Sequence, residues 1–240
     1  MVAIGNFLFH YRNGIFPLVY ALLIFKSQPL MGDYRLAALI GFFVAASGQL
    51  VRAVTIGLEY IKRGGRQRQV YADKLVEGGI FAHCRNPLYI GNFVILLGVA
   101  VASNSVLFLG IAAPFFAFAY WAIIAAEEDY LRKKFGPKFD DYCARVNRLV
   151  PNLFGVGRTL TGMRFNWRRL ITAEYGSAYI WLVGVSLVTL KNTWTAGEYH
   201  AGNPVIWMSW GLLAVATLAY AMARLLKKGG HLKHVVTASS

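Results

Sequence analysis

The sequence predicts an all-α protein, a polytopic bundle of about six transmembrane helices with both termini in the cytoplasm. Hydrophobic residues make up 57% of the 240-residue chain and charged residues only 15%, which is too apolar for an ordinary soluble domain. Residues 88–126 contain no charged residue and no histidine, and these 39 residues are nearly twice the roughly 20 that one membrane helix needs. A bilayer is therefore the expected environment.

Apolar stretches between polar breaks predict where the spans lie. Pro87 suits the first turn of a helix, where a missing N–H costs nothing, and Ser103-Asn104-Ser105 supplies a turn between two spans. Only the 13 residues 13–25 separate Arg12 from Lys26, so Lys26 would have to extend to the membrane surface. The expected spans are Gly14–Met31, Leu36–Leu58, Leu88–Ala102, Val106–Ala126, Tyr175–Leu190 and Ala201–Ala223.

The net charge of +14 is explained by membrane topology rather than by nucleic-acid binding. With the N-terminus inside, only Lys26, Arg35 and Lys191 of the 25 basic residues fall near the outer face. This is the positive-inside bias of an inner or endoplasmic membrane protein. We therefore expect an integral protein of the bacterial inner membrane or the eukaryotic endoplasmic reticulum, and no nucleic-acid partner. Ser27-Gln28-Pro29 is a poor cleavage site, so the first apolar segment is expected to be retained.

Neither the cysteines nor the histidines form a pattern typical of metal binding. Cys84 and Cys143 both fall on the expected cytoplasmic side, where thiols stay reduced, and neither has a CxxC or Cys/His spacing. His231 and His234 lie in a polar tail without a third ligand. The sequence predicts neither a disulfide nor a metal site.

A polar segment after the fourth span predicts a helix at the cytoplasmic membrane surface. Phe139, Tyr142, Val146 and Leu149 recur at helical spacing, with charged residues between them, and Pro151 ends the pattern. An amphipathic helix packed beneath the bundle fits this pattern. We expect a core over residues 1–154, a linker with a further transmembrane hairpin over 155–228, and a tail over 229–240.

Charged residues at the membrane edge mark the candidate site. Arg52 lies inside the second span, where it either extends to the headgroups or faces a polar cavity. Glu127, Glu128 and Asp129 close the fourth span, and their mutual repulsion needs cationic neutralisation. The neutralising groups are either the following basic residues, Arg132, Lys133 and Lys134, or a bound cationic ligand.

A third polar group, Arg85-Asn86-Pro87 followed by Tyr89, begins the third span at the same level. If the three groups converge, they supply an anion clamp, an amide, aromatic faces and carboxylates. Such a set suits a ligand with a carboxylate, an ammonium, a purine and a sulfonium cation. S-adenosylmethionine has all four.

At these residues the chain resembles the superfamily of isoprenylcysteine carboxyl methyltransferases and phospholipid methyltransferases, which are integral membrane enzymes. The segment "LVEGGIFAHCRNPLYIGN" is similar to one family block, and "EEDYLRKKFGPKFDDYCARVNRLVP" to the other. A weaker match, "GQLVRAVTIG", brings in Arg52. Together these segments cover about residues 48–151. The chain departs from the common family pattern in two places, because Asn86 replaces a frequent His and Phe139 a frequent Tyr.

The resemblance implies an S-adenosylmethionine site between the two blocks on the cytosolic side. The expected catalytic residues are Arg52, Glu127 and Glu128, and no metal is expected to take part. The expected cofactor-binding residues are His83, Arg85, Asn86, Pro87, Tyr89, Glu127, Glu128 and Tyr142.

A lipid-like or hydrophobic acceptor is expected to enter sideways from the bilayer, and its reacting group is left open among carboxylate, amine, phosphate and thiol. Arg52 would orient an anionic acceptor, whereas Glu127 or Glu128 would take the proton of an amine. The hairpin over 175–223 is expected to shape the lateral gate or a homodimer contact. The alternatives are an NADPH-dependent membrane reductase of the sterol type, or a non-catalytic transporter or scaffold with a buried ion-pair network.

Overall fold

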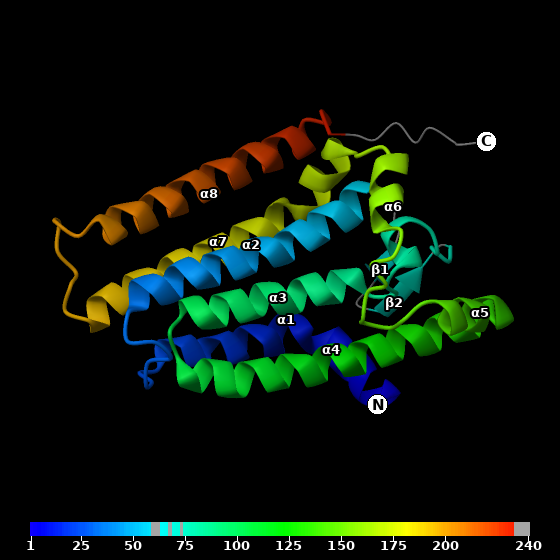
Figure 1. Cartoon of the computed structure of the whole chain (residues 1–240), viewed down its shortest axis with the longest axis horizontal. Coiled ribbons are helices and arrows are strands. Elements are labelled where there is room, and N and C mark those ends of the chain that lie inside the picture. The colour runs from blue at the N-terminus through cyan, green and yellow to red at the C-terminus, as the bar shows by residue number, and fades with distance from the viewer. Residues whose placement is uncertain (59–62, 67–68, 73, 233–240) are drawn as a thin grey trace.

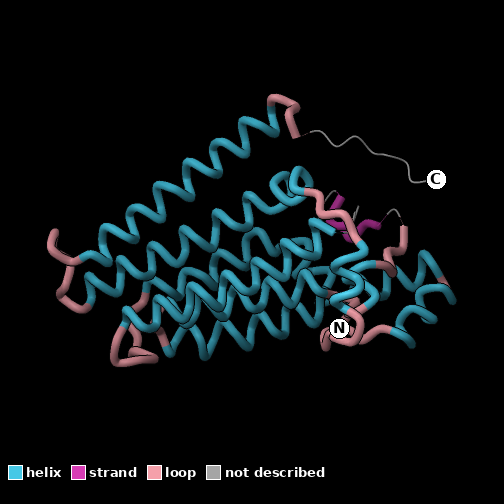
Figure 2. The backbone as a smooth tube through the Cα atoms, turned by 45° about the horizontal axis from the view of Figure 1, so that its top comes forward, coloured by secondary structure: helices cyan, strands magenta, loops and turns pink. Residues whose placement is uncertain are grey.

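The computed structural model describes residues 1–58, 63–66, 69–72 and 74–232, and it is an elongated bundle of helices (Figure 1). In chain order the elements are α1 Val2–Tyr20, η1 Ala21–Ile24, α2 Tyr34–Leu58, β1 Arg63–Arg66, β2 Gln69–Ala72, η2 Gly79–Ala82, α3 Pro87–Ala102, α4 Val106–Phe135, α5 Pro137–Arg145, α6 Val156–Gly162, α7 Trp167–Thr195 and α8 Pro204–Lys228. The long helices run side by side, and the short elements β1, β2, α5 and α6 gather at the end of the bundle where the N-terminus lies (Figures 1 and 2).

Five helices in the described ranges are long and apolar enough to cross a membrane: α1 with η1, α2, α4, α7 and α8. The expected third span, α3, is apolar but has only 16 residues. At 1.5 Å per residue it is about 24 Å long, shorter than the roughly 30 Å apolar core of a bilayer. The predicted class, a helical membrane protein, is confirmed, while the number of spans and the side of the termini stay predictions.

The first membrane helix begins earlier than the sequence predicts. It was expected at Gly14–Met31, but it occupies Val2–Tyr20 and continues through η1 to Ile24. That expectation placed Arg12 outside the apolar core, because a charge within a membrane helix is costly. In the structure Arg12 lies in the middle of α1, with its guanidinium 4.2 Å from the centre of the Phe9 ring. The positive charge of Arg12 therefore lies within a helix that is long and apolar enough to cross a membrane.

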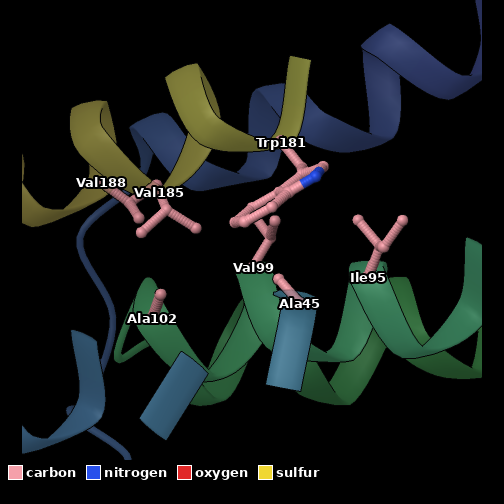
Figure 3. Packing of buried hydrophobic residues seen from close by; sticks show 7 residues of the cluster. All are labelled: Ala45, Ile95, Val99, Ala102, Trp181, Val185 and Val188. Atoms are coloured by element: carbon pink, nitrogen blue, oxygen red, sulfur yellow. The ribbon is translucent and has the colours of Figure 1, made fainter. Parts of the chain in front are cut away.

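Close packing of α2, α3 and α7 forms the centre of the bundle. A Cβ atom built on Gly98 of α3 would lie 2.3 Å from the backbone nitrogen of Ala45 in α2, so only glycine permits this approach. Figure 3 shows Trp181 of α7 lying over Val99 of α3 beside Ala45, in one buried cluster with Ile95, Ala102, Val185 and Val188. This contact fixes α7 against the two helices that carry Arg52 and the Arg-Asn-Pro corner.

Short elements cover the end of the bundle where the C-terminal end of α4 lies. The expected surface helix is present as α5, and the apolar side chains of Phe139, Tyr142 and Val146 are buried as predicted. It ends at Arg145 rather than at Pro151, because the backbone is already extended at Val146. The basic connection after α2, expected as a loop, contains the antiparallel hairpin of β1 and β2. The predicted tail starts at Gly229, after α8, and His234 lies outside the described residues.

Candidate functional site

A hollow of about 290 Å³ lies where the predicted polar groups meet. Six of the residues that the sequence predicts for the site line it: Arg52, Arg85, Asn86, Pro87, Tyr89 and Glu127. They come from α2, from the corner before α3, from α3 itself and from the C-terminal half of α4. The structure therefore brings together side chains that are up to 75 positions apart in the chain.

The Arg-Asn-Pro corner is held by the segment that follows α5. Asn86 precedes α3, and Pro87 occupies the first turn, where its missing N–H is tolerated. The backbone N–H of Arg85 donates to the carbonyl of Asn147 at 3.0 Å, and the Asn86 amide Nδ2 donates to the carbonyl of Arg148 at 3.1 Å. These two hydrogen bonds directly connect the two segments that resemble the family. They fix the positions of the side chains that face the hollow.

Two adjacent glutamates at the inner end of α4 have different surroundings. Glu127 lines the hollow, and its Oε1 accepts a hydrogen bond of 2.8 Å from the hydroxyl of Tyr89. Glu128 is 4% exposed and does not line the hollow; it is the counter-ion of Arg85, at 3.1 Å, and of Arg148. Ligand contact is therefore geometrically open to Glu127, whereas Glu128 positions the Arg85 guanidinium.

The acidic run is neutralised partly by a basic residue of its own helix and partly by residues from other elements. Of the basic residues that directly follow it, Lys133 pairs with Asp129 at 2.7 Å, whereas Arg132 pairs with Asp140 of α5. Glu128 takes its partners from the Arg85 corner and from Arg148 instead.

Arg85 has an unsatisfied donor in the wall of the hollow. Its Nη2 contacts Glu128, and its Nη1 donates to the carbonyl of Cys143 at 3.1 Å. Its Nε is buried and has no hydrogen-bond partner among the described residues. Because a buried N–H without a partner is costly, the position of this side chain is held against a penalty by its contacts with Glu128 and Cys143.

Arg52 is held by Glu174 of α7, which is not among the residues that the sequence predicts for the site. The Arg52 Nε donates to Glu174 Oε2 at 2.7 Å and Nη2 to Oε1 at 2.6 Å, so the ion pair is bidentate. Arg52 Nη1 donates to the amide oxygen of Asn92, and Gln49 donates to Glu174 at 2.9 Å. The signal in the sequence is an acidic residue at the start of an apolar helix, a position that is costly without a partner.

Besides Glu128, two predicted cofactor-binding residues, His83 and Tyr142, lie outside the lining of the hollow. The Nδ1 of His83 is 2.8 Å from the carbonyl of Asn152, and its Nε2 is 2.8 Å from the hydroxyl of Thr159, so the ring is held toward α6. The buried Tyr142 donates its hydroxyl to the carbonyl of Phe81 at 2.7 Å. Phe81 lines the hollow, so Tyr142 supports its wall.

Cys84 and Cys143 are free thiols close to the Arg85-Asn86-Pro87 corner. Burial raises the pKa of the Cys84 thiol, whose Sγ is 3.6 Å from the carbonyl of Arg148, and burial also raises the pKa of Cys143. Within the described ranges, no group of three or more His, Cys, Asp or Glu side chains is placed to hold a metal ion.

Five further residues line the hollow and are not predicted as site residues: Phe9, Arg12, Phe81, Leu88 and Asn92. Phe9 and Arg12 come from α1, and Asn92 comes from α3 one turn after Tyr89. The earlier start of α1 explains the first two, because it moves Arg12 from the membrane surface into the helix beside the site. An arginine within an apolar stretch is the signal for it in the sequence.

The hollow lies at one end of a bundle with five membrane-long helices among the described residues, which indicates an integral membrane protein. The family described as phospholipid methyltransferase matches residues 37–138, from the start of α2 to the start of α5. The match confirms the resemblance to the isoprenylcysteine and phospholipid methyltransferase superfamily over this segment. The match to this family over residues 37–138 suggests methyltransferase activity. Helices α1, α7 and α8 lie outside the matched residues.

Two bacterial proteins are similar to this chain. The nickel-cobalt-cadmium resistance protein NccN of Alcaligenes xylosoxydans xylosoxydans is 39% identical over 80 residues, which is 33% of this chain and 37% of NccN. The cobalt-zinc-cadmium resistance protein CzcN of Cupriavidus metallidurans is 27% identical over 199 residues, which is 78% of this chain and 83% of CzcN. No solved structure matches the chain.

Proposed function

We propose that this protein is an S-adenosylmethionine-dependent methyltransferase of the membrane, which transfers a methyl group to a hydrophobic acceptor taken from the bilayer. The observation that carries the proposal is the single hollow lined by Arg52, the Arg85-Asn86-Pro87 corner, Tyr89 and Glu127. The match of residues 37–138 to the phospholipid methyltransferase family supports the reaction class. Most basic residues of the chain fall near those ends of the expected spans where the site residues also lie. By the positive-inside rule, this excess supports a cytoplasmic position for the site.

The residues that line the hollow fit the charges of the methyl donor. The positive charge of Arg85, which lines the hollow, suits a carboxylate, and Glu127 suits an ammonium or sulfonium cation. The aromatic rings of Phe9, Phe81 and Tyr89 suit a purine and a cation. A volume of about 290 Å³ is at the lower end of the roughly 300–1,000 Å³ typical of small-molecule sites.

Methyl transfer needs alignment of donor and acceptor and the exclusion of water. When bound, S-adenosylmethionine supplies an electrophilic methyl group, which bonds to a nucleophilic acceptor as the carbon–sulfur bond breaks and sulfur keeps the electron pair. Glu127 is the residue placed to take the proton that an amine acceptor must lose. Glu128, which also pairs with Arg148, holds the Arg85 side chain, and the segment after α5 accepts a hydrogen bond from the Asn86 side chain.

The proposal is tested by incubating purified protein with labelled S-adenosylmethionine and a native lipid extract, followed by mass spectrometry of the labelled product. We expect a labelled hydrophobic product, and we expect Glu127→Gln to lower the rate at least about tenfold, because a charge-assisted interaction is worth roughly 1.5–3 kcal/mol. Asp129→Asn is the matched control, since Asp129 lies two residues away in an exposed pair with Lys133. Absence of any labelled product, or equal rates for the two variants, contradicts the proposal.

The names of the two relatives describe resistance of a cell to metal ions rather than a reaction at a site. A methylated membrane component that alters metal tolerance would reconcile those names with the proposed chemistry. Growth of the host with and without cobalt, carrying either the wild-type gene or Glu127→Gln, tests this link. Equal metal tolerance of the two strains would separate the methyl transfer from metal resistance.

A further inference from the structure

A second hollow adjoins the polar one and is about 630 Å³ in volume, more than twice as large. Apolar side chains of α1, η1, α3 and α7 form most of its wall, including those of Leu23, Ile95, Val99 and Trp181. Asn92 lines both hollows, so the two hollows are neighbours on either side of this residue. The proposed methyl-donor site is therefore adjacent to a large apolar space between the helices.

We propose that this apolar hollow binds the hydrocarbon chain of the methyl acceptor, a single-chain amphiphile whose reacting head lies at Asn92. This inference rests on the proposed methyl transfer and adds to it the place and the shape of the acceptor. Along α7 the lining runs from Ser177 to Lys191, which is 14 residues or about 21 Å at 1.5 Å per residue. That length exceeds one leaflet of the roughly 30 Å apolar core, so it suits a long extended chain.

An acceptor head would lie at the end of the apolar hollow that is formed by Asn92. Arg52 donates to the amide oxygen of Asn92, which leaves the Asn92 NH₂ group to donate toward the junction. Tyr89 lies three residues earlier in α3, so it shares a helix face with Asn92, and its hydroxyl is bonded to Glu127. A head at Asn92 is therefore next to the carboxylate and the arginine that line the donor hollow.

The outer end and the side of the hollow suit a hydrocarbon chain. The ammonium of Lys191 is directed onto the backbone carbonyls of Leu23 and Phe25, so the apolar stem of Lys191 is what remains along the hollow. Ile180 and Leu187 of α7 line the same hollow and are 71% and 50% exposed, which places them at its edge toward the bilayer. A chain can therefore enter sideways between α7 and its neighbours.

The residues that would select the acceptor chain lie mostly outside the segment matched to the phospholipid methyltransferase family. Helix α1 and η1 precede residues 37–138, and α7 follows them. Only Asn92, Ile95, Val99 and Tyr120 of the lining belong to the matched segment. Chain selection is therefore assigned mainly to helices outside the matched segment, whereas most of the donor hollow, apart from Phe9 and Arg12, lies within it.

Gly184 allows a direct test, because it lines the apolar hollow and a Cβ built on it would be 3.9 Å from the nearest atom, in Val99. Gly184→Leu and Gly184→Phe therefore place a side chain in the hollow without a clash at Cβ. Gly176→Phe is the matched control, because Gly176 is on the same helix, does not line the hollow and has no atom within 4 Å of its built Cβ. Both Gly184 variants are included so that one misfolded protein does not decide the result.

The first readout is photolabelling by a diazirine-bearing hexadecylamine and a diazirine-bearing hexadecanoic acid, with peptides identified by mass spectrometry. We expect labels on peptides that contain Val99 and Trp181, displaced by excess unlabelled probe and reduced at least fivefold in both Gly184 variants. Labelling in Gly176→Phe should equal that in the wild type. Labelling that unlabelled probe does not displace, or that is equal in the Gly184 variants, reflects bulk lipid and overturns the inference.

The second readout is the binding of S-adenosylhomocysteine by calorimetry, which separates this inference from the proposed function. The affinity of both Gly184 variants should stay within twofold of the wild type, because Gly184 does not line the donor hollow. Displaceable photolabelling without S-adenosylhomocysteine binding would reject the methyl-transfer reaction on which the inference rests. Binding of S-adenosylhomocysteine with unchanged photolabelling in the Gly184 variants would reject the acceptor hollow and leave the methyltransferase proposal standing.

Discussion

The ion pair between Arg52 and Glu174 should dominate the stability of the helix core, and Glu174→Ala tests it. The two side chains are only 14% and 5% exposed, and two hydrogen bonds of 2.6 and 2.7 Å join them. Removing the carboxylate leaves a buried guanidinium without its counter-ion, and it also removes the acceptor of the Gln49 amide. Breaking one partner of a buried pair costs about 3–5 kcal/mol.

This loss of stability is large enough to measure in detergent. For a chain of this size, 1 kcal/mol shifts the melting temperature by about 2–4 °C, so Glu174→Ala should melt roughly 6–20 °C lower than the wild type. Unfolding can be followed with a thiol-reactive dye, because Cys84 is buried in the folded protein. Substituting both partners by leucine should recover most of the loss, because a buried ion pair can often be replaced by apolar side chains.

Asp140→Ala is the control for the melting experiment. Its pair with Arg132 has the same kind of charges at 2.7 Å, but both side chains are about half exposed. Exposed pairs contribute about 0–1 kcal/mol, so the melting temperature should change by only a few degrees. If Glu174→Ala shifts the melting temperature no more than Asp140→Ala does, the Arg52–Glu174 pair is not the buried tie described above.

Three further predictions concern packing, the wall of the site and pH. Gly98→Val should abolish the yield of monodisperse protein on gel filtration, because its Cβ would lie 2.3 Å from the backbone of Ala45; a normal yield would contradict the close approach of α2 and α3. Tyr142→Phe should lower stability by about 1–3 kcal/mol in thermal unfolding, because the buried carbonyl of Phe81 loses its donor; an unchanged melting temperature would show that the bond is dispensable. Hydrogen bonds from the Tyr34 hydroxyl and then from the Arg35 guanidinium lower the pKa of Glu198. The contribution of Glu198 to stability should therefore be complete above the ordinary carboxyl pKa of about 4.3 and lost as pH falls through the lowered pKa. The measured stabilities of the wild type and Glu198→Gln should converge in acid. A difference between them that does not change with pH would contradict this last assignment.

The membrane helices and the end of the bundle that carries the site could be predicted from the sequence because their signals are local. A long uncharged stretch predicts membrane helices, and Pro87 after Asn86 predicts the start of α3, where the structure has it. The buried face of α5 follows from the helical spacing of Phe139 and Tyr142. The start of α1 could not be predicted in this way, because the structure places Arg12 within the helix, against Phe9 and the hollow, where a solvated position was expected.

The partners of the site residues could not be predicted, because they depend on how distant helices pack. Arg52 is expected either to extend to the headgroups or to face a polar cavity, and its counter-ion Glu174 lies 122 residues later, beyond the segment that resembles the family. Glu127 and Glu128 are equivalent in the sequence, and only the position of Arg85 separates the residue that faces the hollow from the one that holds the guanidinium. His83 lies within the family-like block, yet its ring is held toward α6 by Asn152.

Isothermal titration of purified protein with S-adenosylhomocysteine and, separately, with NADPH tests the central claim most directly. The account predicts saturable binding of S-adenosylhomocysteine, weakened about 10–100-fold by Arg85→Ala because a hydrogen bond to a charged group is lost, and no comparable binding of NADPH. Tight binding of NADPH with no response to S-adenosylhomocysteine would contradict it and would assign the hollow to a reductase.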